Sequence, residues 1–494
     1  MKNPTIPDLI TCVLPVDRNA EIKKTLKALR SSGVVARIIL IGDPAVIPDA
    51  LDVVGISNGN LFSTQTIREF TQKINTRYTL ICTKSLPFDL GQNALSRMMQ
   101  VSEATSAGMV YSDFFEQIHE IVKPHPVIEY LDGSLRDDFD FGSLMLYRTD
   151  IMVAAVEKMD QLFELAGLYD LRLKVSQQHK LIHLPEILYT ELELDTRKSG
   201  EKLFDYVDTR NRFKQIEMEQ ACTLHLKAVG AWLPPIFREL FFSDDDFELE
   251  ASVIIPVRNR AKTISDAINS VLSQETEFDF NLIIVDNHST DGTTELIRTF
   301  AESDDRIIHV IPKRNDLGIG GCWNEAVNHA SCGKFAIQLD SDDLYIDNTV
   351  IKRIVDTFYE QRCAMVIGSY QMVNFNLESI PPGLIDHKEW TPDNGRNNAL
   401  RINGLGAPRA FYTPVLREIQ VPNVSYGEDY AVGLAISRHF RIGRIYNPLY
   451  LCRRWDENSD SSLDIATMNA HNFYKDKVRT LELWSRQKLV KDQQ

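Results

Sequence analysis

Three carboxylates occupy one four-residue segment, Asp340-Ser341-Asp342-Asp343, directly after the apolar run 334–339. Such a run predicts a buried strand, and a strand end fixes the backbone, so alternate carboxylates there can converge on one point. Carboxylate oxygens are the ligands that Mg²⁺ and Mn²⁺ prefer, and these ions bind diphosphates by bridging their oxygens. The segment therefore predicts a divalent-metal site, although an acidic turn after a strand is also a common structural feature.

Two further polar segments suit a nucleotide site. Asp286 ends an apolar run, so its carboxylate can accept hydrogen bonds from a base or a ribose, and the small polar residues up to position 293 suit a turn and a helix start. Residues 315–321 are rich in glycine, which lets backbone approach a ligand closely. Loops are often glycine-rich, so this second segment is weak evidence by itself.

A pair of adjacent carboxylates, Glu428-Asp429, supplies a candidate general base. A carboxylate is ionised at pH 7 and can accept a proton from a hydroxyl within hydrogen-bond reach. The same pair at a helix start could simply compensate the helix dipole.

The elements that must position these residues alternate between strand and helix. Short apolar runs predict strands at 251–257, 281–285 and 334–339, and helical spacing of apolar residues follows at 261–274, 293–300 and 323–330. This alternation predicts βαβ units and a mostly parallel sheet, with functional residues at the carboxyl ends of the strands.

The N-terminal half repeats the plan, because runs at 9–16, 37–41 and 78–82 parallel the three strands above. We expect an α/β protein with two tandem domains. The predicted organisation is a first domain at 1–200, a helical linker at 201–248, a catalytic domain at 249–455 and a helical tail at 456–494 that packs onto the catalytic domain.

The order of motifs in the second half resembles glycosyltransferase family 2. The matching stretches are PVRNR, VDNHSTDGT, NDLGIGGCWNEA, LDSDD and Gly427-Glu428-Asp429, within about residues 250–462. The resemblance implies a GT-A fold, which is Rossmann-like, for each of the two domains. It further implies an inverting, metal-dependent transferase that uses Mn²⁺ or Mg²⁺ and moves a sugar from a nucleotide-sugar, most often a UDP-sugar, to a hydroxyl of a glycan or glycoconjugate.

The resemblance also implies residue roles. Asp429 is the expected base, Glu428 orients the acceptor, and Asp342 ligates the metal. Asp340 is expected to contact the ribose or sugar and is a further candidate metal ligand. Asp286 is expected to read the base of the nucleotide. The expected nucleotide-sugar pocket consists of Pro256, Val257, Arg258, Asp286, Asn315, Gly318, Asn324, Asp340 and Ser341.

One departure concerns the end of the domain, where family members often carry a metal-site His. Trp455 stands in that place, and indole cannot ligate a metal. Either Asp456 or Asn458 takes over as a metal ligand, or Arg453 and Arg454 hold the diphosphate by charge.

The first domain is expected to be catalytically inactive. Thr83, Lys84, Ser85 and Leu86 stand where the second domain has its DSDD segment, and Leu168-Tyr169 stand where it has Glu428-Asp429. Such a domain would serve packing, homo-oligomerisation or acceptor binding. The alternative is a metal-independent transferase that uses Lys84.

Bulk composition narrows the function further. The chain has 494 residues and a formal net charge of −15, so it is a poor candidate for binding nucleic acid. We see no run long enough for a transmembrane segment, and we expect a cytoplasmic protein of polysaccharide biosynthesis, with peripheral association at the inner membrane face as a variant. The rival functions are a non-catalytic carbohydrate-binding scaffold and a nucleotidyltransferase.

Overall fold

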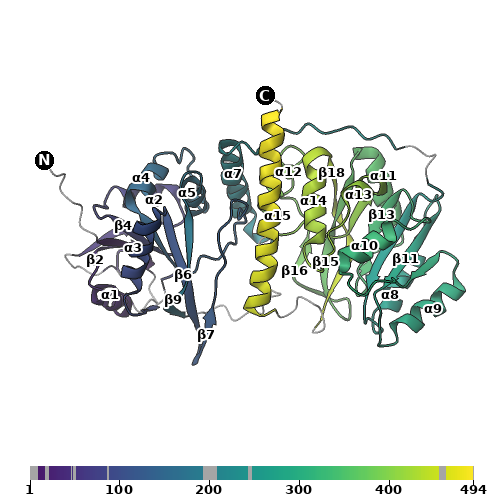
Figure 1. The fold of residues 1–494 in the computed structure, drawn as a ribbon, viewed down its shortest axis with the longest axis horizontal. Coiled ribbons are helices and arrows are strands. Elements are labelled where there is room, and N and C mark those ends of the chain that lie inside the picture. The colour runs from purple at the N-terminus through teal and green to yellow at the C-terminus, as the bar shows by residue number, and fades with distance from the viewer. Residues whose placement is uncertain are drawn as a thin grey trace. The chain divides into compact units, whose positions relative to one another are not determined.

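The computed structural model describes residues 9–16, 22–45, 47, 52–85, 88–192, 208–242, 247–455 and 463–492. The chain forms two compact units (Figure 1). The first unit consists of Met1–Lys198, Phe213–Trp232 and Leu463–Gln494, and the second of Ser199–Arg212 and Leu233–Ser462.

The second unit contains the predicted βαβ units. Its strands are β10 (Ala251–Val257), β11 (Phe280–Asp286), β12 (Ile307–Val310), β13 (Phe335–Gln338), β14 (Leu344–Tyr345), β15 (Met365–Asn374), β16 (Ser379–Ile385), β17 (Arg409–Tyr412) and β18 (Ile442–Arg454). Its helices are α8 (Ile264–Leu272), α9 (Thr293–Ser303), α10 (Ile319–Val327), α11 (Val350–Gln361), α12 (Gly395–Asn398), α13 (Thr413–Ile419) and α14 (Glu428–His439).

The strands of the second unit form one sheet in the order β12-β11-β10-β13-β17-β15-β18-β14, with β16 paired to β15. The strands from β12 to β13 are parallel, β17 is antiparallel to both its neighbours, and β15 is parallel to β18. Val253, Ile254 and Ile255 in β10 are fully buried, as expected for a strand covered on both faces. Because β10, β11 and β13 are parallel neighbours, their carboxyl ends meet at one edge.

The first unit has the same strand order, β3-β2-β1-β4-β8-β6-β9-β5, with β7 paired to β6. Its strands are β1 (Ile10–Val16), β2 (Val35–Gly42), β3 (Val53–Ser57), β4 (Tyr78–Cys82), β5 (Phe88–Leu90), β6 (Met109–Ile118), β7 (Ile121–His125), β8 (Leu144–Arg148) and β9 (Leu181–Leu192). Its helices are α1 (Ile22–Ser31), α2 (Thr64–Thr71), α3 (Ala94–Thr105), α4 (Thr149–Val156), α5 (Gly167–Ser176), α7 (Arg212–Ala228) and α15 (Ile465–Asp492). The predicted duplication of an α/β domain is confirmed.

Helices α7 and α15 differ from the predicted organisation. Helix α7 falls in the range predicted as a linker, but Glu217 accepts hydrogen bonds from the backbone N–H groups of Leu165 and Ala166 at 2.7 and 3.1 Å, just before α5. Helix α15 was expected to pack onto the second unit, yet it belongs to the first, where Asp476 accepts a hydrogen bond from Ser134 at 2.9 Å. Apolar spacing alone does not tell which sheet a helix covers.

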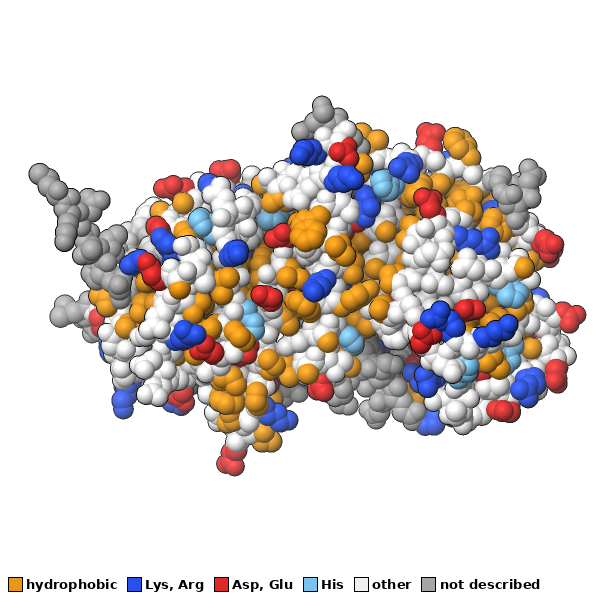
Figure 2. Space-filling view, viewed as in Figure 1, with side chains coloured by type: hydrophobic (Ala, Val, Ile, Leu, Met, Phe, Trp, Pro, Cys, Tyr) orange, Lys and Arg blue, Asp and Glu red, His pale blue; other side chains and the backbone are white. Residues whose placement is uncertain are grey.

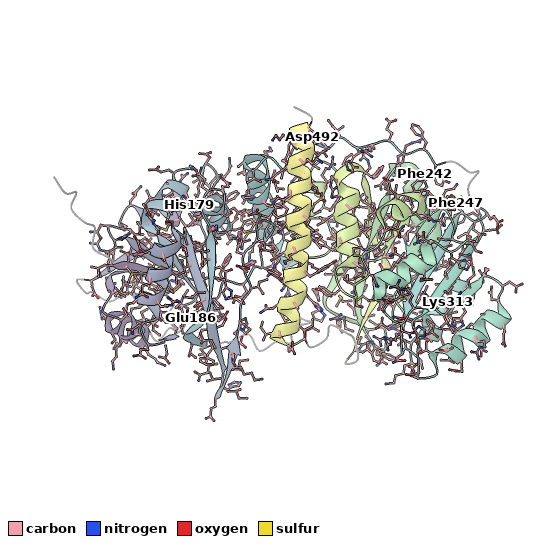
Figure 3. The ribbon with its side chains drawn as sticks, in the orientation of Figure 1. His179, Glu186, Phe242, Phe247, Lys313 and Asp492 are labelled. Atoms are coloured by element: carbon pink, nitrogen blue, oxygen red, sulfur yellow. The ribbon has the colours of Figure 1, made fainter. Side chains whose placement is uncertain are left out.

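The surface shows acidic and basic side chains interspersed on the face drawn in Figure 2, and the stick view in Figure 3 places labelled residues on both units. None of the described helices combines the length and the apolar composition that crossing a bilayer requires.

Candidate active site

The DSDD segment begins where β13 ends, and its first carboxylate is held in place by two neighbours. Gln338 donates to the Asp340 carboxylate at 2.8 Å, and the backbone N–H of Asp340 donates to the Tyr450 hydroxyl at 2.9 Å. The Gln338 side chain also accepts from the backbone N–H of Arg409 at 3.1 Å. Gln338 and Tyr450 thus tie the tip of β13 to β17 and β18.

Asp342 and Asp343 are fixed by the end of β18. The Asp343 carboxylate accepts from the backbone N–H of Arg453 at 2.7 Å, and the Arg453 guanidinium donates to the Asp342 carbonyl. Trp455 donates its indole N–H to the Asp342 carboxylate at 3.4 Å, while Arg260 lies 3.8 Å from the same carboxylate. Trp455 therefore orients Asp342, and Arg453, whose side chain is 3% exposed, acts as scaffold.

The charges of this segment suit a cation. Burial raises the pKa of Asp343 well above its usual range, and the neighbouring Asp342 and Asp340 add to the rise. Burial also raises the pKa of Asp340, with Asp342 adding to the rise and Arg409 opposing it. Among the described residues, no three His, Cys, Asp or Glu side chains form a complete metal-binding set. Because carboxylate oxygens suit Mg²⁺ or Mn²⁺, Asp342 and Asp340 are the residues that would hold such an ion.

Arg409, at the start of β17, joins the two acidic groups. Its guanidinium forms an ion pair with Asp429 at 2.7 Å, and the nearby charges of Asp429, Asp340 and Glu428 all raise its pKa against the opposing effect of burial. The structure thus brings together Asp340 and the predicted base, which are 89 positions apart in the chain. Glu428 and Asp429 form the first turn of α14, after Gly427 with its φ of 77°.

Glu428 differs from its neighbour. Burial, and then the charge of Asp429, raise the pKa of Glu428 to about 8. One of its carboxyl oxygens is buried and has no hydrogen-bond partner in the described part of the chain. Glu428 is therefore protonated at pH 7, with an O–H that can donate.

Asp286 ends β11 but has no exposed surface. Its carboxylate accepts from the backbone N–H of Ser289 at 3.0 Å and from the Thr294 hydroxyl at 2.5 Å, and His309 lies 3.5 Å away. Burial opposes ionisation, but the bonds from His309, Thr294 and Ser289 outweigh it and lower the pKa of Asp286 well below its usual range. In this conformation Asp286 shapes the loop after β11 and offers no surface with which to read a base.

The glycine-rich segment packs against protein rather than leaving open space. A Cβ added at Gly320 would lie 1.8 Å from the Pro422 carbonyl oxygen, and one at Gly318 would lie 2.6 Å from the Val424 carbonyl carbon. Asn324 donates to the Val421 carbonyl at 2.7 Å and accepts from the Val421 N–H at 2.9 Å. Gly318 and Asn324 therefore position the segment that leads to Glu428.

The remaining predicted residues lie around the same edge. Pro256 and Val257, at the end of β10, pair in register with Val285 and Asp286. Arg258 and Asn315 are exposed loop residues, Ser341 is buried, and Arg454 ends β18. The predicted metal ligand Asp456 lies outside the described residues.

Several residues of this site were not predicted from the sequence. Arg409, Tyr450 and Gln338 reach the site only through the pairing of β13, β17 and β18, and none stands within a recognisable motif. The only local signal for Gln338 was its position near the end of the predicted strand, two residues before the acidic segment.

Among the described residues of the first unit, the equivalent edge carries different groups. Its Met145 faces Ile81 in the register where Arg409 stands in the second unit, and Lys84 forms an ion pair with Glu191 at 2.6 Å. Leu86 lies outside the described residues. The positively charged Lys84 thus stands in the segment where the second unit has the carboxylates that a metal would need.

Comparison with known proteins finds similar sequences and structures. Residues 252–414 match the model of Glycosyl transferase family 2. The chain is 23% identical over 233 residues to the poly(ribitol-phosphate) beta-glucosyltransferase of Bacillus spizizenii, which covers 46% of this chain and 35% of that protein. It is 27% identical over 186 residues to the putative teichuronic acid biosynthesis glycosyltransferase TuaG of Bacillus subtilis, covering 37% of this chain and 71% of that protein.

Similar structures include Staphylococcus aureus TarS 1–349 in complex with UDP, with 21% identity and a TM-score of 0.37, covering 47% of this chain and 65% of that one. The chain thus spans about a third of the first relative's length and under two thirds of this structure.

Proposed function

Because its residues 252–414 make this chain a member of glycosyl transferase family 2, we propose that the second unit transfers a sugar from a nucleotide-sugar to a hydroxyl of a glycan or glycoconjugate. One observation carries the proposal. Arg409 lies between the carboxylate that would act as base and the acidic tip of β13, so acceptor and donor chemistry share one edge of the sheet.

Asp429 is the proposed base. Its ion pair with Arg409 favours the ionised carboxylate, which can accept a proton at pH 7. Glu428 keeps its own proton up to about pH 8, so it is a poor acceptor and a suitable donor for orienting a hydroxyl or ring oxygen. The two adjacent carboxyls therefore divide the work, because their environments separate their protonation states.

Asp342 and Asp340 are the proposed ligands of a Mn²⁺ or Mg²⁺ ion, which would supply electrostatic stabilisation of the departing diphosphate. Trp455 keeps Asp342 oriented through its indole N–H. Pro256, Val257 and Arg258 would line the nucleotide pocket next to this site, and we propose UDP as the nucleotide.

The proposed reaction is a single displacement. Asp429 takes the proton of the acceptor hydroxyl as its oxygen forms a bond to the anomeric carbon. The bond from that carbon to the diphosphate oxygen breaks on the opposite face, and the nucleoside diphosphate leaves with the electron pair. Attack opposite to the leaving group inverts the anomeric centre.

The relatives suggest a class of acceptor. One is named for poly(ribitol-phosphate) and another for teichuronic acid biosynthesis, so we propose a role in polysaccharide biosynthesis. The first unit, in whose described residues we find no such base or metal site, would contribute to acceptor binding or self-association.

A panel of nucleotide sugars tests the proposal. The full chain, incubated with each donor and Mn²⁺ or Mg²⁺, is expected to release the nucleoside diphosphate and to gain thermal stability with the matching donor. Release with none of them, together with no thermal shift, would favour a non-catalytic carbohydrate-binding protein. Release of pyrophosphate from a nucleoside triphosphate would favour a nucleotidyltransferase.

A further inference from the structure

A cavity of about 760 Å³ opens in the first unit, away from the edge that corresponds to the active site. Its walls come from the segment 129–132, from the end of α5 with the following turn, from the start of β9 and from α15. His179, labelled in Figure 3, stands in the turn after α5. A volume in this range suits a small ligand, since ligand cavities measure about 300–1,000 Å³.

Helix α15 gives the cavity an aromatic wall. Trp484 is 51% exposed, and its indole N–H donates to the Asp132 carboxylate at 3.2 Å. Leu481, 60% exposed, lies three residues earlier and so shares the same helix face. The bond to Asp132 fixes the edge of the indole and leaves its apolar face available. An exposed, oriented ring of this kind suits a ligand with a flat apolar face.

The rest of the lining is polar and carries both charges. Glu129, Gln178, Lys180 and Lys477 are exposed at its rim and offer hydrogen-bond donors and acceptors. The Tyr130 hydroxyl is buried in the lining, beside the Ser176 side chain. A ligand with several hydroxyl groups can hydrogen-bond to these donors and acceptors, whereas a purely apolar ligand cannot.

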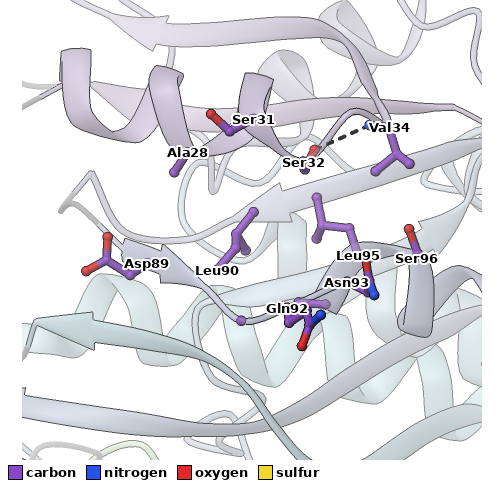
Figure 4. A pocket seen from close by; sticks show the side chains of 12 residues that line it. Ala28, Ser31, Ser32, Val34, Asp89, Leu90, Gln92, Asn93, Leu95 and Ser96 are labelled. Carbon is purple, nitrogen blue, oxygen red and sulfur yellow. Dashed lines mark hydrogen bonds between the residues drawn. The ribbon is translucent and has the colours of Figure 1, made fainter.

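A second cavity of the first unit serves as a comparison for the lining of the first cavity. It measures about 340 Å³ and lies between the end of α1 and the segment from β5 to α3 (Figure 4). None of its lining residues is aromatic or basic, and the Ser32 hydroxyl accepts from the nearby Val34 N–H at 3.4 Å. It offers no stacking surface.

We propose that the larger cavity, lined by Trp484 and Tyr130, is a saccharide-binding site that holds part of the acceptor glycan. A sugar ring presents an apolar C–H face to the indole and hydroxyls to the surrounding Gln, Lys and carboxylate groups. A second copy of this chain is the competing occupant, but the recessed cavity and its ring of mixed polar groups match a small polyhydroxylated ligand better than a protein surface.

This inference rests on the proposed transferase function, because that function supplies a glycan acceptor. The first unit has lost the groups for donor chemistry, so a site for the acceptor gives it a role in the same reaction.

Saturation-transfer NMR on the full chain tests the site. The probes are glucose, galactose, mannose, N-acetylglucosamine and N-acetylgalactosamine, each in excess. At least one sugar is expected to give a signal that falls about fivefold or more in Trp484→Ala and partly returns in Trp484→Phe. Gln178→Ala, at an exposed rim position, is expected to weaken the signal without any risk to folding. The matched control is Leu162→Ala, since Leu162 is 66% exposed on the same unit but outside the cavity.

Three results would overturn the site: no signal from any of the sugars, an unchanged signal in Trp484→Ala and Gln178→Ala, or a wild-type dimer that Trp484→Ala converts to a monomer in light scattering. Donor hydrolysis, measured on the same variants, separates the two proposals. Leu162→Ala, outside the cavity, is expected to hydrolyse the nucleotide-sugar at the wild-type rate. A Trp484-dependent sugar signal in a wild-type chain that hydrolyses no donor would leave the site standing and reject the transferase.

Discussion

Arg409 and Asp429 form an ion pair of 2.7 Å that links the start of β17 to the first turn of α14. The same guanidinium also donates to the Gly406 carbonyl at 2.6 Å, so its direction is fixed from both sides. This pair holds the proposed base in position.

Replacing Asp429 by Asn removes the base while keeping its shape. We expect kcat to fall by about 10²–10⁴-fold, with the KM for the donor nearly unchanged, because the carboxylate acts on the acceptor proton. Steady-state kinetics at saturating acceptor measure this. Activity near that of the wild type would show that Asp429 is not the base.

Replacing Arg409 by Met copies the first unit, where Met145 holds the equivalent register position. We expect kcat to fall by about 10²-fold or more, because Asp429 loses the charge that keeps it ionised and placed. Arg298→Met, at an exposed site on α9, is the control and is expected to keep full activity. If Arg409→Met were as active as Arg298→Met, Arg409 would have no role in catalysis.

Glu428→Gln mimics the protonated carboxyl that we infer at pH 7. Because the pKa of Glu428 is about 8, wild-type Glu428 loses its proton as pH rises past that value, whereas Gln cannot. We expect this variant to keep most of the wild-type kcat at pH 7 and to lack any decline that wild type shows between pH 7 and 9. A loss as large as that of Asp429→Asn at pH 7 would reverse the two roles.

Asp342→Ala is expected to abolish the response to metal. Its carboxylate is held at a strand end by Trp455 and Arg260 and is not part of the hydrophobic core, so the apo protein should keep its melting temperature. Turnover should fall by about 10²–10³-fold, and Mn²⁺ with UDP should no longer raise Tm. Asp356→Ala, on the solvent side of α11, serves as a control; a retained Mn²⁺ shift in Asp342→Ala would place the metal elsewhere.

His125 in the first unit makes stability depend on pH. Burial lowers its pKa, but Asp140 at 2.9 Å and Glu116 at 3.5 Å outweigh burial and raise it to about 9. A raised His pKa stabilises the fold fully below the unfolded value of 6.5, and the contribution disappears as pH rises through 9. His125→Gln should therefore cost about 1–3 kcal/mol at pH 6 and much less at pH 10, measured by urea unfolding. An equal cost at both pH values would contradict this linkage.

The fold could be predicted because its signals are local. Apolar runs such as 251–257 and their repetition at 9–16 depend on neighbouring residues only, and both became equivalent strands. The acidic tip of β13 and the Glu428-Asp429 pair were found for the same reason.

The features of the site that could not be predicted depend on pairing between strands that are far apart in the sequence. Arg409 acquires its meaning only when β17 inserts beside β13, and nothing in its local sequence indicates that order. For Asp286, the position at a strand end was predicted, but its burial was not. Its hydrogen bonds from Ser289 and Thr294 and its ion pair with His309 were not predicted either. Local sequence indicates the position of a residue in its strand or helix, whereas tertiary contacts determine whether its side chain is accessible to a ligand.

Helix α15 follows the whole second unit in the chain, yet Gly133 of the first unit donates to its Thr480 hydroxyl at 3.0 Å and would have a Cβ 2.2 Å from the Thr480 backbone nitrogen. The first unit therefore cannot finish folding until residues 463–492, beyond the second unit, have been synthesised. No single cut separates the duplicated halves: a fragment that stops after α7 loses a helix from its interior. Any attempt to dissect the two halves must graft residues 463–492 back onto the first one.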